Sequence, residues 1–297
     1  MDHTRSKHSH DLPKVAYVIP IISILIFSLP CLANDGIYDS RGIEFKPFSR
    51  QARVLSLAPN ASELIAFVGA TTQLVGRTEN CDFPPEIAKV PAVKGPFNIN
   101  FEWVLRQKPD LVMMTDGADH TREKLKRMNI PVFTVSLEKV EELPRQIRVV
   151  GRLLGRAPEA IVKAKKLSKE INLLRLNQPK RKTRVFWEIW SKPIMSVGAR
   201  SFVGDAIRYA GGQNIFGDVQ KKWPVVDEET ILRKQPQLIF TLNKKEFLER
   251  RQHWIKALNL HESQIVQIEN PDQIHRPTPR LITGIKWIKN VIENNRH

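Results

Sequence analysis

Two glutamates stand at matching positions of a repeated segment. Glu102 lies in NFEWVLRQKPDLV (residues 100–112) and Glu229 in DEETILRKQPQLI (residues 227–239), and one offset of 127 residues aligns the two segments. Each glutamate falls in the first turn of an expected helix, after an Asn or Asp capping residue, where the helix dipole stabilises a carboxylate by about 0.3–1 kcal/mol. The alternative role for such a pair is to form ion pairs with cationic groups of a partner protein.

Catalytic motifs are missing from the sequence. There is no G-x-S-x-G nucleophile elbow, no H-E-x-x-H zinc motif, no phosphate-binding P-loop and no glycine fingerprint of a dinucleotide site. A catalytic site would have to be assembled from isolated residues such as Asp82, Asp116 and His120, and single acids and histidines are common in loops. We therefore expect a protein without enzyme activity, catalytic residues, cofactor or resident metal.

The chain carries an excess of positive charge, with 47 Lys and Arg against 31 Asp and Glu and a formal net charge of +16. Such a balance is compatible with nucleic-acid binding. The charges are spread along the whole length, however, and the densest cluster, Lys180 to Arg184, lacks a recognition-helix pattern, zinc-ligand spacing or interleaved aromatic residues. We therefore interpret the charge as a solvated basic surface and expect no nucleic-acid partner.

The N-terminus has the features of an export signal. A basic lead-in precedes Val15 to Leu29, an apolar run of about fifteen residues that is short for a membrane span and is interrupted by a proline. Small residues at Cys31 and Ala33 fit a cleavage site, so we expect residues 1–33 to be a cleaved signal peptide and the protein to be exported. The alternatives are an uncleaved membrane anchor and a lipid attached to Cys31, for which the preceding proline is unfavourable.

After the expected signal peptide, the sequence predicts a pattern of secondary structure that occurs twice. Residues 34–52 are polar and are expected to form an irregular linker. Residues 53–136 alternate short apolar strands with short helices, and residues 181–297 do the same, which predicts mainly parallel sheets covered by helices. Residues 137–180 carry only helical signals, including a lone connecting helix from Pro158 to Asn177 that would span about 30 Å. The predicted fold class is α/β, with two similar lobes joined by one long backbone helix and a ligand cleft between the lobes.

Several segments resemble a known family. They are RVLSLAPNASEL (residues 53–64), DFPP (82–85), NFEWVLRQKPDLV (100–112), GGQNIF (211–216), WPVVDEETIL (223–232) and RPTPRL (276–281). In their order and spacing they are similar to the periplasmic binding proteins with a rigid helical backbone, the metal-receptor family of ABC importers. The similarity is strongest to members that bind a corrinoid such as vitamin B12. It covers residues 53–294, nearly the whole chain after the expected signal peptide.

The resemblance implies an exported, monomeric carrier that holds a metal chelate between its lobes and delivers it to the membrane subunits of an ABC importer. The expected ligand is a corrinoid, with a ferric siderophore or haem as alternatives in the same family and a small-ligand enzyme as a further alternative. Glu102 and Glu229 match the acidic residues with which family members dock on the importer. The expected ligand-binding residues are Asn80, Phe97, Trp190, Trp223, Asp272, Gln273, Ile274, His275 and Arg276.

The sequence also departs from the corrinoid-binding members. Asn80 replaces a tyrosine, and Pro96 and Thr115 stand at positions that are aromatic in those proteins. An asparagine cannot stack on a macrocycle as an aromatic ring does. Phe97 or Trp190 can supply the missing aromatic surface.

Four side chains near the expected cleft can act on a ligand, and three of them also have a purely structural interpretation. His275 can coordinate cobalt or iron, or it is a plain loop residue. Arg276 and Arg280 can bind carboxylates or phosphate of a ligand, but Arg280 is also expected on the surface of the last helix, which Thr278 would cap. Trp187 can compensate for a missing aromatic residue, although its place on a strand favours packing in the core.

Overall fold

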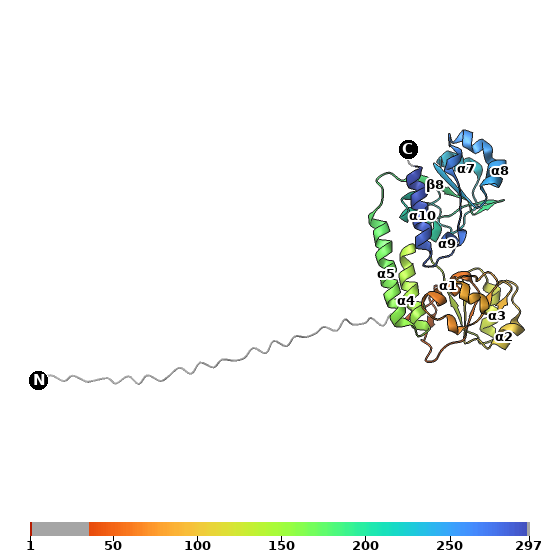
Figure 1. Cartoon of the computed structure of the whole chain (residues 1–297), viewed down its shortest axis with the longest axis vertical. Helices are drawn as coiled ribbons and strands as arrows, with labels where there is room; N and C mark the ends of the chain where they lie inside the picture. Colours follow the sequence, from red (N-terminus) through yellow and green to blue (C-terminus); the bar gives the residue numbers. More distant parts are fainter. Residues whose placement is uncertain (2–35, 296–297) are drawn as a thin grey trace. The chain divides into compact units, whose positions relative to one another are not determined.

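The computed structural model describes Met1 and residues 36–295, so that the expected signal peptide, apart from Met1, lies outside the described residues. Residues 36–295 belong to one compact unit. Its strands form two separate parallel sheets and two short antiparallel hairpins, with helices around the sheets (Figure 1). Over residues 36–295, no helix combines the length and the apolar character that crossing a bilayer requires.

The first lobe is built on a five-stranded parallel sheet in the order β5-β4-β3-β6-β7. Its strands are β3 (Val54–Ser56), β4 (Leu74–Thr78), β5 (Ala92–Val93), β6 (Leu111–Met114) and β7 (Val132–Thr134). Its helices are α1 (Pro59–Phe67), α2 (Phe101–Gln107) and α3 (Asp119–Arg127), with the short 3-10 helices η1 (Thr71–Gln73) and η2 (Pro85–Lys89). The alternation of strands and helices expected from the sequence is confirmed.

The second lobe contains a four-stranded parallel sheet in the order β11-β8-β12-β13. Its strands are β8 (Thr183–Trp187), β11 (Gly212–Asn214), β12 (Leu238–Thr241) and β13 (Ile265–Gln267), with the hairpin of β9 (Trp190–Ser191) and β10 (Ile194–Met195). Its helices are α6 (Phe202–Tyr209), α7 (Glu228–Lys234), α8 (Lys244–Ala257), the 3-10 helix η4 (Glu262–Gln264), α9 (Pro271–His275) and α10 (Leu281–Asn294).

Alternate residues of the central strands belong to different hydrophobic cores. In β3, Val54 belongs to a large core and Leu55 to a smaller one; in β8, Val185 and Phe186 divide in the same way. This follows from the two-residue period of a strand, whose neighbouring side chains point to opposite faces. The large core is shared by both lobes, whereas each smaller core lies under the helices of one lobe only.

The repeated segment folds into the same structure twice. In α2, the side chain of Asn100 accepts a hydrogen bond from a backbone N–H of the first turn, and Asp227 does the same in α7. Both helices end at a residue in the left-handed conformation, Lys108 with φ of 45° and Gln235 with φ of 46°. The capping that the sequence predicts is therefore confirmed at both copies.

The two copies also share a contact between strand and helix. Arg53 Nε donates to the backbone oxygen of Lys108 at 3.2 Å, and Arg184 Nε donates to the backbone oxygen of Gln235 at 2.6 Å. Each arginine thus satisfies a carbonyl at the C-terminal end of a helix, where a positive charge is favoured. The sequence repeat is therefore a structural repeat.

The connector between the lobes consists of η3 (Val140–Glu142), α4 (Leu143–Leu153) and α5 (Ala157–Leu176). The 20 residues of α5 confirm the long helix that the sequence predicts. It is not a lone helix, because α4 packs along it (Figure 1). A Cβ on Gly151 would lie 2.1 Å from the Cβ of Ala160, so the two helices approach too closely for a larger residue at this position. The connector is a packed pair of helices.

Residues 36–52 differ from the irregular linker expected there. The strands β1 (Ile37–Tyr38) and β2 (Glu44–Phe45) pair with each other. The ring of Phe45 lies edge-on to that of Phe133, with centroids 5.0 Å apart, and the Asp39 carboxylate accepts the N–H of Thr134 at 3.1 Å. The segment therefore packs on β7, at the edge of the first sheet.

The start of α10 also differs from the expectation. The helix begins at Leu281, and Thr278 does not cap it. The carbonyl of Thr278, rather than its hydroxyl, accepts the Leu281 N–H at 2.9 Å, and within residues 36–295 the buried Thr278 hydroxyl has no hydrogen-bond partner. Thr278 is thus part of a tight turn that leads from α9 into α10.

Candidate functional site

A buried carboxylate on α1 joins the two lobes. Glu63 is only 4% exposed, and its partners Arg276 and Arg280 come from the turn between α9 and α10 in the second lobe. Arg276 Nη1 donates to Glu63 Oε1 at 3.1 Å, and Arg280 Nε donates to Glu63 Oε2 at 2.9 Å. Each carboxylate oxygen therefore has a guanidinium partner, which is the condition under which a charge can be buried at low cost.

Arg276 is the centre of a wider ionic cluster. Its Nη1 also donates to Asp82 Oδ1 at 2.6 Å, while its Nη2 lies 3.0 Å from Asp272 Oδ2 and 3.5 Å from the backbone oxygen of Asn80. The hydrogen bond from Arg276 lowers the pKa of Asp82 below its ordinary value of 3.8. Three residues expected to bind the ligand, Asn80, Asp272 and Arg276, are thus brought together where the lobes meet.

Arg280 is not a surface residue of the last helix, and that expectation is wrong. Besides its bonds to Glu63, its guanidinium carbon lies 3.9 Å from the centroid of the Phe83 ring. The turn after α9 directs this side chain toward the first lobe instead of toward solvent. The cluster therefore holds three carboxylates for two guanidinium groups, and both arginines already have anionic partners. These carboxylates are those of Glu63, Asp82 and Asp272.

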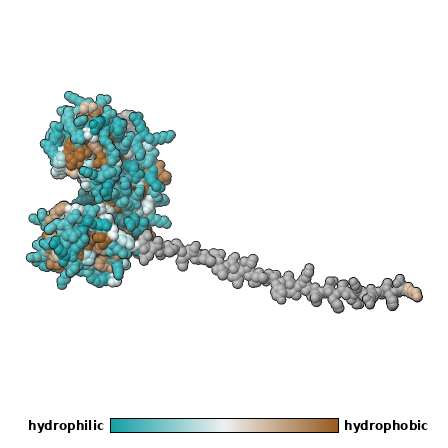
Figure 2. Space-filling model, turned by 180° about the vertical axis from the view of Figure 1, so that it is seen from behind, coloured by the Kyte–Doolittle hydropathy of each residue, from teal (hydrophilic) through white to brown (hydrophobic). Residues whose placement is uncertain are grey.

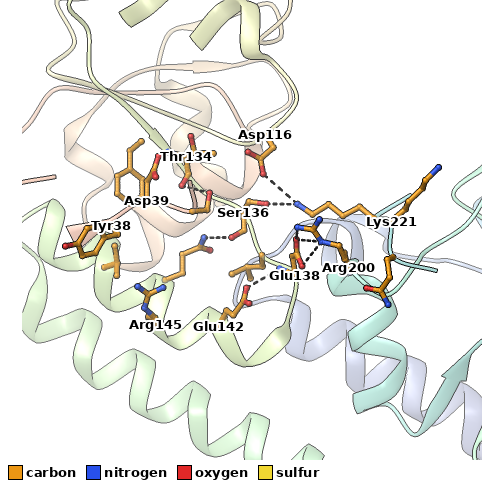
Figure 3. Close-up of a pocket in the computed structure, with 17 residues that line it drawn as sticks. Tyr38, Asp39, Asp116, Thr134, Ser136, Glu138, Glu142, Arg145, Arg200 and Lys221 are labelled. Atoms are coloured by element: carbon orange, nitrogen blue, oxygen red, sulfur yellow. Dashed lines mark hydrogen bonds and ion pairs between the residues drawn. The ribbon is translucent and has the colours of Figure 1, made fainter. Parts of the chain in front are cut away.

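A second set of contacts joins the second lobe to Asp116 of the first lobe and to Glu138 of the connector, and it borders a cavity of about 680 Å³ (Figure 3). Lys222 Nζ of the second lobe lies 3.7 Å from Asp116 Oδ2, and Arg200 Nη2 donates to Glu138 Oε1 at 2.6 Å. The hydrogen bond from Arg200 also lowers the pKa of Glu138 below its ordinary value of 4.5. The nine expected ligand residues are all described, and none of them lines this cavity, although Trp223 directly follows Lys222.

Three of the expected ligand residues expose aromatic rings on a mainly hydrophilic surface (Figure 2). Phe97 is 73% exposed, Trp190 61% and Trp223 37%. Met195 of β10 pairs with Trp190 on one side and forms a bridge to Val225 on the other, so the segments of Trp190 and Trp223 flank β10. Phe97 has no ring contact or hydrogen bond with the other expected residues in the described part of the chain. Exposed aromatic side chains are typical of binding surfaces.

Trp187 and His275 form a buried pair in the second lobe. Trp187 is fully buried and stacks on Phe240 with centroids 4.8 Å apart, which confirms its packing in the core. Its Nε1 donates to His275 Nε2 at 3.2 Å. Burial lowers the pKa of His275 from 6.5 to about 4, so the ring is neutral at neutral pH. Because Nε2 already accepts a hydrogen bond, this nitrogen has no free lone pair for cobalt or iron.

Gln273 and Ile274 are held by the close packing of α9 on α10. A Cβ on Gly284 would lie 2.7 Å from Ile274 Cγ1 and 2.8 Å from the backbone oxygen of Gln273. Ile274 belongs to the large core, whereas Gln273 is half-buried. The Ile274 side chain therefore faces the protein interior, and contact with a ligand would have to come from its neighbours on α9.

Glu102 and Glu229 lie on the outer helices α2 and α7. The side chain of Glu229 is 89% exposed and lies 3.9 Å from Arg233 Nη1. Glu102 is exposed, and in residues 36–295 it takes part in no ion pair. Both carboxylates stand in the first turn of a capped helix and are accessible to a partner. The helix-dipole role and the docking role are therefore compatible with each other.

The family of the chain follows from its sequence. A profile described as "Periplasmic binding protein" matches residues 54–261. The chain belongs to the periplasmic binding protein family. It is 31% identical over 247 residues to a vitamin B12-binding protein of Salmonella paratyphi A, which covers 81% of this chain and 90% of that protein. It is 28% identical over 253 residues to a vitamin B12-binding protein of Vibrio cholerae, with coverage of 82% and 89%.

Solved structures of periplasmic binding proteins share the fold. The periplasmic vitamin B12-binding protein of Vibrio cholerae matches with a TM-score of 0.69 at 24% identity and covers 82% of this chain and 98% of its own. The periplasmic haem-binding protein of the same organism matches with a TM-score of 0.69 at 17% identity and covers 82% and 99%. The predicted family and the α/β fold with two lobes are thus confirmed. The fold is common to binders of different chelates and does not select among them.

Glu63 was not anticipated as a functional residue. The signal for it is a single acidic residue within the apolar helix segment SELIAFV (residues 62–68), together with two arginines spaced four residues apart at Arg276 and Arg280. The enzyme alternative relied on a different set of residues. In that set, Asp82 pairs with Arg276 and Asp116 with Lys222, and no contact in the described chain joins either to His120.

We expect Glu63→Gln to lower the free energy of unfolding by about 3 kcal/mol, because it removes the carboxylate that Arg280 pairs with and one of the three carboxylates that Arg276 pairs with. Urea denaturation of the purified protein measures this change. The exposed Glu86, changed to Gln, serves as the control and should shift stability by less than about 0.5 kcal/mol. Equal unfolding midpoints for the two variants would show that Glu63 does not hold the lobes together.

The lowered pKa of His275 predicts a dependence of stability on pH. The unfolded chain binds a proton near pH 6.5 and the folded chain only near pH 4, so the free energy of unfolding should fall as the pH drops through this window. The loss amounts to about 3 kcal/mol at pH 4. Urea midpoints measured from pH 7 to pH 4.5 should show a shallower slope for His275→Gln than for the wild type. The control His120→Gln, at an exposed position, should keep the wild-type slope.

Proposed function

We propose that this chain is an exported, monomeric binding protein that captures a corrinoid of the vitamin B12 type between its lobes. It passes the ligand unchanged to the membrane subunits of an ABC importer. The observation that carries the proposal is the meeting of Asp272 and Arg276 with Asn80 and Asp82 across the two lobes. Both sides of this contact belong to segments that resemble the ligand-binding loops of corrinoid-binding relatives.

The charges at this contact favour a corrinoid over haem or an anionic siderophore. The two arginines already share the three carboxylates of Glu63, Asp82 and Asp272, so they offer no unpaired positive charge to ligand carboxylates. A haem carries propionates and many ferric siderophores carry net negative charge, and both would meet an excess of carboxylate. A corrinoid instead presents peripheral amide groups, which can exchange hydrogen bonds with carboxylates and with the Asn80 amide.

The exposed rings provide the apolar part of the proposed site. Trp190 and Trp223 lie on the two segments that flank β10, and their exposed rings can contact a flat macrocycle. Phe97 would contribute from the first lobe and Gln273, Ile274 and His275 from α9, with Asp272 and Arg276 beside them. We assign none of these residues a metal-binding role.

The proposed division of the chain follows the two sheets. Residues 1–33 would be the signal peptide, 34–52 the leading segment, 53–136 and 181–297 the lobes, and 137–180 the connector. Export to the periplasm follows from the proposed signal peptide and is supported by the periplasmic names of the relatives. The absence of a catalytic motif supports binding without turnover.

Titration of the purified protein with cyanocobalamin, haem and a ferric siderophore, followed by visible absorbance and calorimetry, tests the ligand. We expect one cyanocobalamin per chain with a Kd in the micromolar range or lower, and weaker binding of the other two. Trp190→Ala and Trp223→Ala should each raise the Kd about tenfold, which corresponds to about 1.4 kcal/mol. Leu173→Ala removes an exposed apolar side chain from α5 and should leave the Kd unchanged. If haem binds more tightly than cyanocobalamin, haem replaces the corrinoid as the proposed ligand. If none of the three ligands binds, the proposed function is refuted.

Docking on the importer is tested by charge reversal on the outer helices. The double variant Glu102→Lys and Glu229→Lys should reduce ligand uptake by cells at least tenfold while the Kd for the ligand stays the same, because both sites lie outside the ligand contact. Glu123→Lys with Glu249→Lys is a matched control, with one exposed glutamate reversed in each lobe. If cells with the double variant Glu102→Lys and Glu229→Lys take up the ligand at the wild-type rate, only the helix-dipole role remains for these glutamates.

A further inference from the structure

The second lobe contains a buried ion pair that the proposed function does not use. Arg251 Nη1 donates to Glu188 Oε1 at 2.5 Å, and both side chains are 6% exposed. The other oxygen of Glu188 accepts the Thr241 hydroxyl at 2.6 Å. Thr241 ends β12 and Glu188 directly follows β8, so the pair lies at the carboxyl ends of the two central strands of the second sheet.

The course of α8 brings Arg251 into this position. The helix from Lys244 to Ala257 is interrupted at Arg251, whose φ of −132° and ψ of 29° are not helical. The guanidinium lies 5.4 Å from the centroid of the Phe247 ring and 5.1 Å from that of the Trp254 ring. Both rings are fully buried, so the arginine enters the lobe between two aromatic residues of its own helix.

The second guanidinium nitrogen bonds a different element, the β9–β10 hairpin. Arg251 Nη2 donates to the backbone oxygen of Ser191 at 3.0 Å. Ser191 is the neighbour of Trp190 in β9, and these two residues pair with Ile194 and Met195 in β10. One side chain of α8 is thus bonded both to the end of the central strand β8 and to the hairpin that exposes Trp190.

Stability alone does not account for this arrangement. Replacing a buried ion pair with apolar residues of similar volume is often neutral or stabilising, so a buried pair is weak evidence for a role in stability. A planar guanidinium, however, can bond two acceptors in fixed directions, which a lysine cannot do. The geometry therefore suits a residue that sets the position of one element relative to another.

We propose that Arg251 is a positioning residue for ligand binding: bonded to Glu188 and to the Ser191 carbonyl, it holds the β9–β10 hairpin so that the ring of Trp190 is presented to the ligand. The proposal rests on the proposed function, since it takes Trp190 to be a ligand contact. Arg251 itself does not touch the ligand. Its effect on affinity passes through Trp190.

A double-mutant cycle between Arg251 and Trp190 tests the proposal. Arg251→Lys keeps the charge opposite Glu188 but cannot also reach the Ser191 carbonyl in the same geometry. In the wild-type background it should raise the Kd for cyanocobalamin about five- to tenfold. In the Trp190→Ala background the same change should alter the Kd less than about twofold. An equal loss of affinity in both backgrounds, or no loss in the wild type, would overturn the proposal.

A matched control separates positioning from the general effect of losing an arginine. Arg208 bonds the buried carboxylate of Asp205 and lies over the Tyr209 ring, but it has no contact with the hairpin. Arg208→Lys should leave the Kd unchanged in both backgrounds. If Arg251→Lys does not fold, Glu188→Gln, which keeps the shape and weakens the same pair, takes its place in the cycle.

Hydrogen exchange tests whether Arg251 positions the hairpin without relying on ligand binding. The Ile189 amide bonds Met195 within the hairpin, and the amides of Ser196 and Val226 make bonds between the hairpin end and residues 224–226. Arg251→Lys should speed the exchange of these three amides at least about tenfold while exchange in the first lobe stays unchanged. If the wild type does not bind cyanocobalamin, the ligand assignment fails, and faster exchange of these amides still supports the positioning role. Unchanged exchange would refute it whether or not a ligand binds.

Discussion

The carboxylate of Glu63 is buried where the two lobes meet, and two arginines of the second lobe bond its two oxygens. Burying a charge costs several kcal/mol unless its partners stay in place. The turn that carries Arg276 and Arg280 is therefore fixed against α1, and with it the α9 segment that begins the proposed ligand contact. Together with the packed helices α4 and α5, this cluster restrains the separation of the lobes, which favours small movements over wide hinge closure.

In each lobe, the two faces of the sheet have different roles: one face packs in the core that joins the lobes, and the other carries the outer helices. One face of each sheet contributes to the core that both lobes share, whereas the other is covered by the outer helices, including α2 and α7. Val104 of α2 and the equivalent Ile231 of α7 anchor these helices in the smaller cores. The glutamates of α2 and α7 can therefore meet a partner protein without disturbing the contact between the lobes.

Much of the fold could be predicted from the sequence, because its signals are local. The period of the apolar residues identified the central strands and α5, and the capping residues Asn100 and Asp227 marked the repeated helices. The errors have physical causes. The packing of Phe45 on Phe133 depends on residues far apart in the chain, and Thr278 uses its carbonyl where a side-chain cap was expected.

The candidate site was predicted less completely than the fold. The segment of Asp272 to Arg276 was found through resemblance, but its pairing with Glu63 and Asp82 joins residues about two hundred positions apart. The spacing of residue types along the sequence gives no signal for a contact between residues so far apart. Burial also limits which residues of this segment can contact a ligand. Ile274 faces the core, and His275 Nε2 already accepts a hydrogen bond from Trp187.

The central claim is that a corrinoid lodges between lobes that this ionic cluster keeps at a fixed separation. Its most direct test is anomalous X-ray scattering at the cobalt absorption edge from crystals grown with cyanocobalamin. We predict one cobalt peak per chain, located between the lobes and flanked by Trp190, Trp223 and the side chain of Asn80, with the bonds from Arg276 and Arg280 to Glu63 intact. A cobalt peak on an outer face of either lobe, or crystals without cobalt at saturating ligand, would contradict the account.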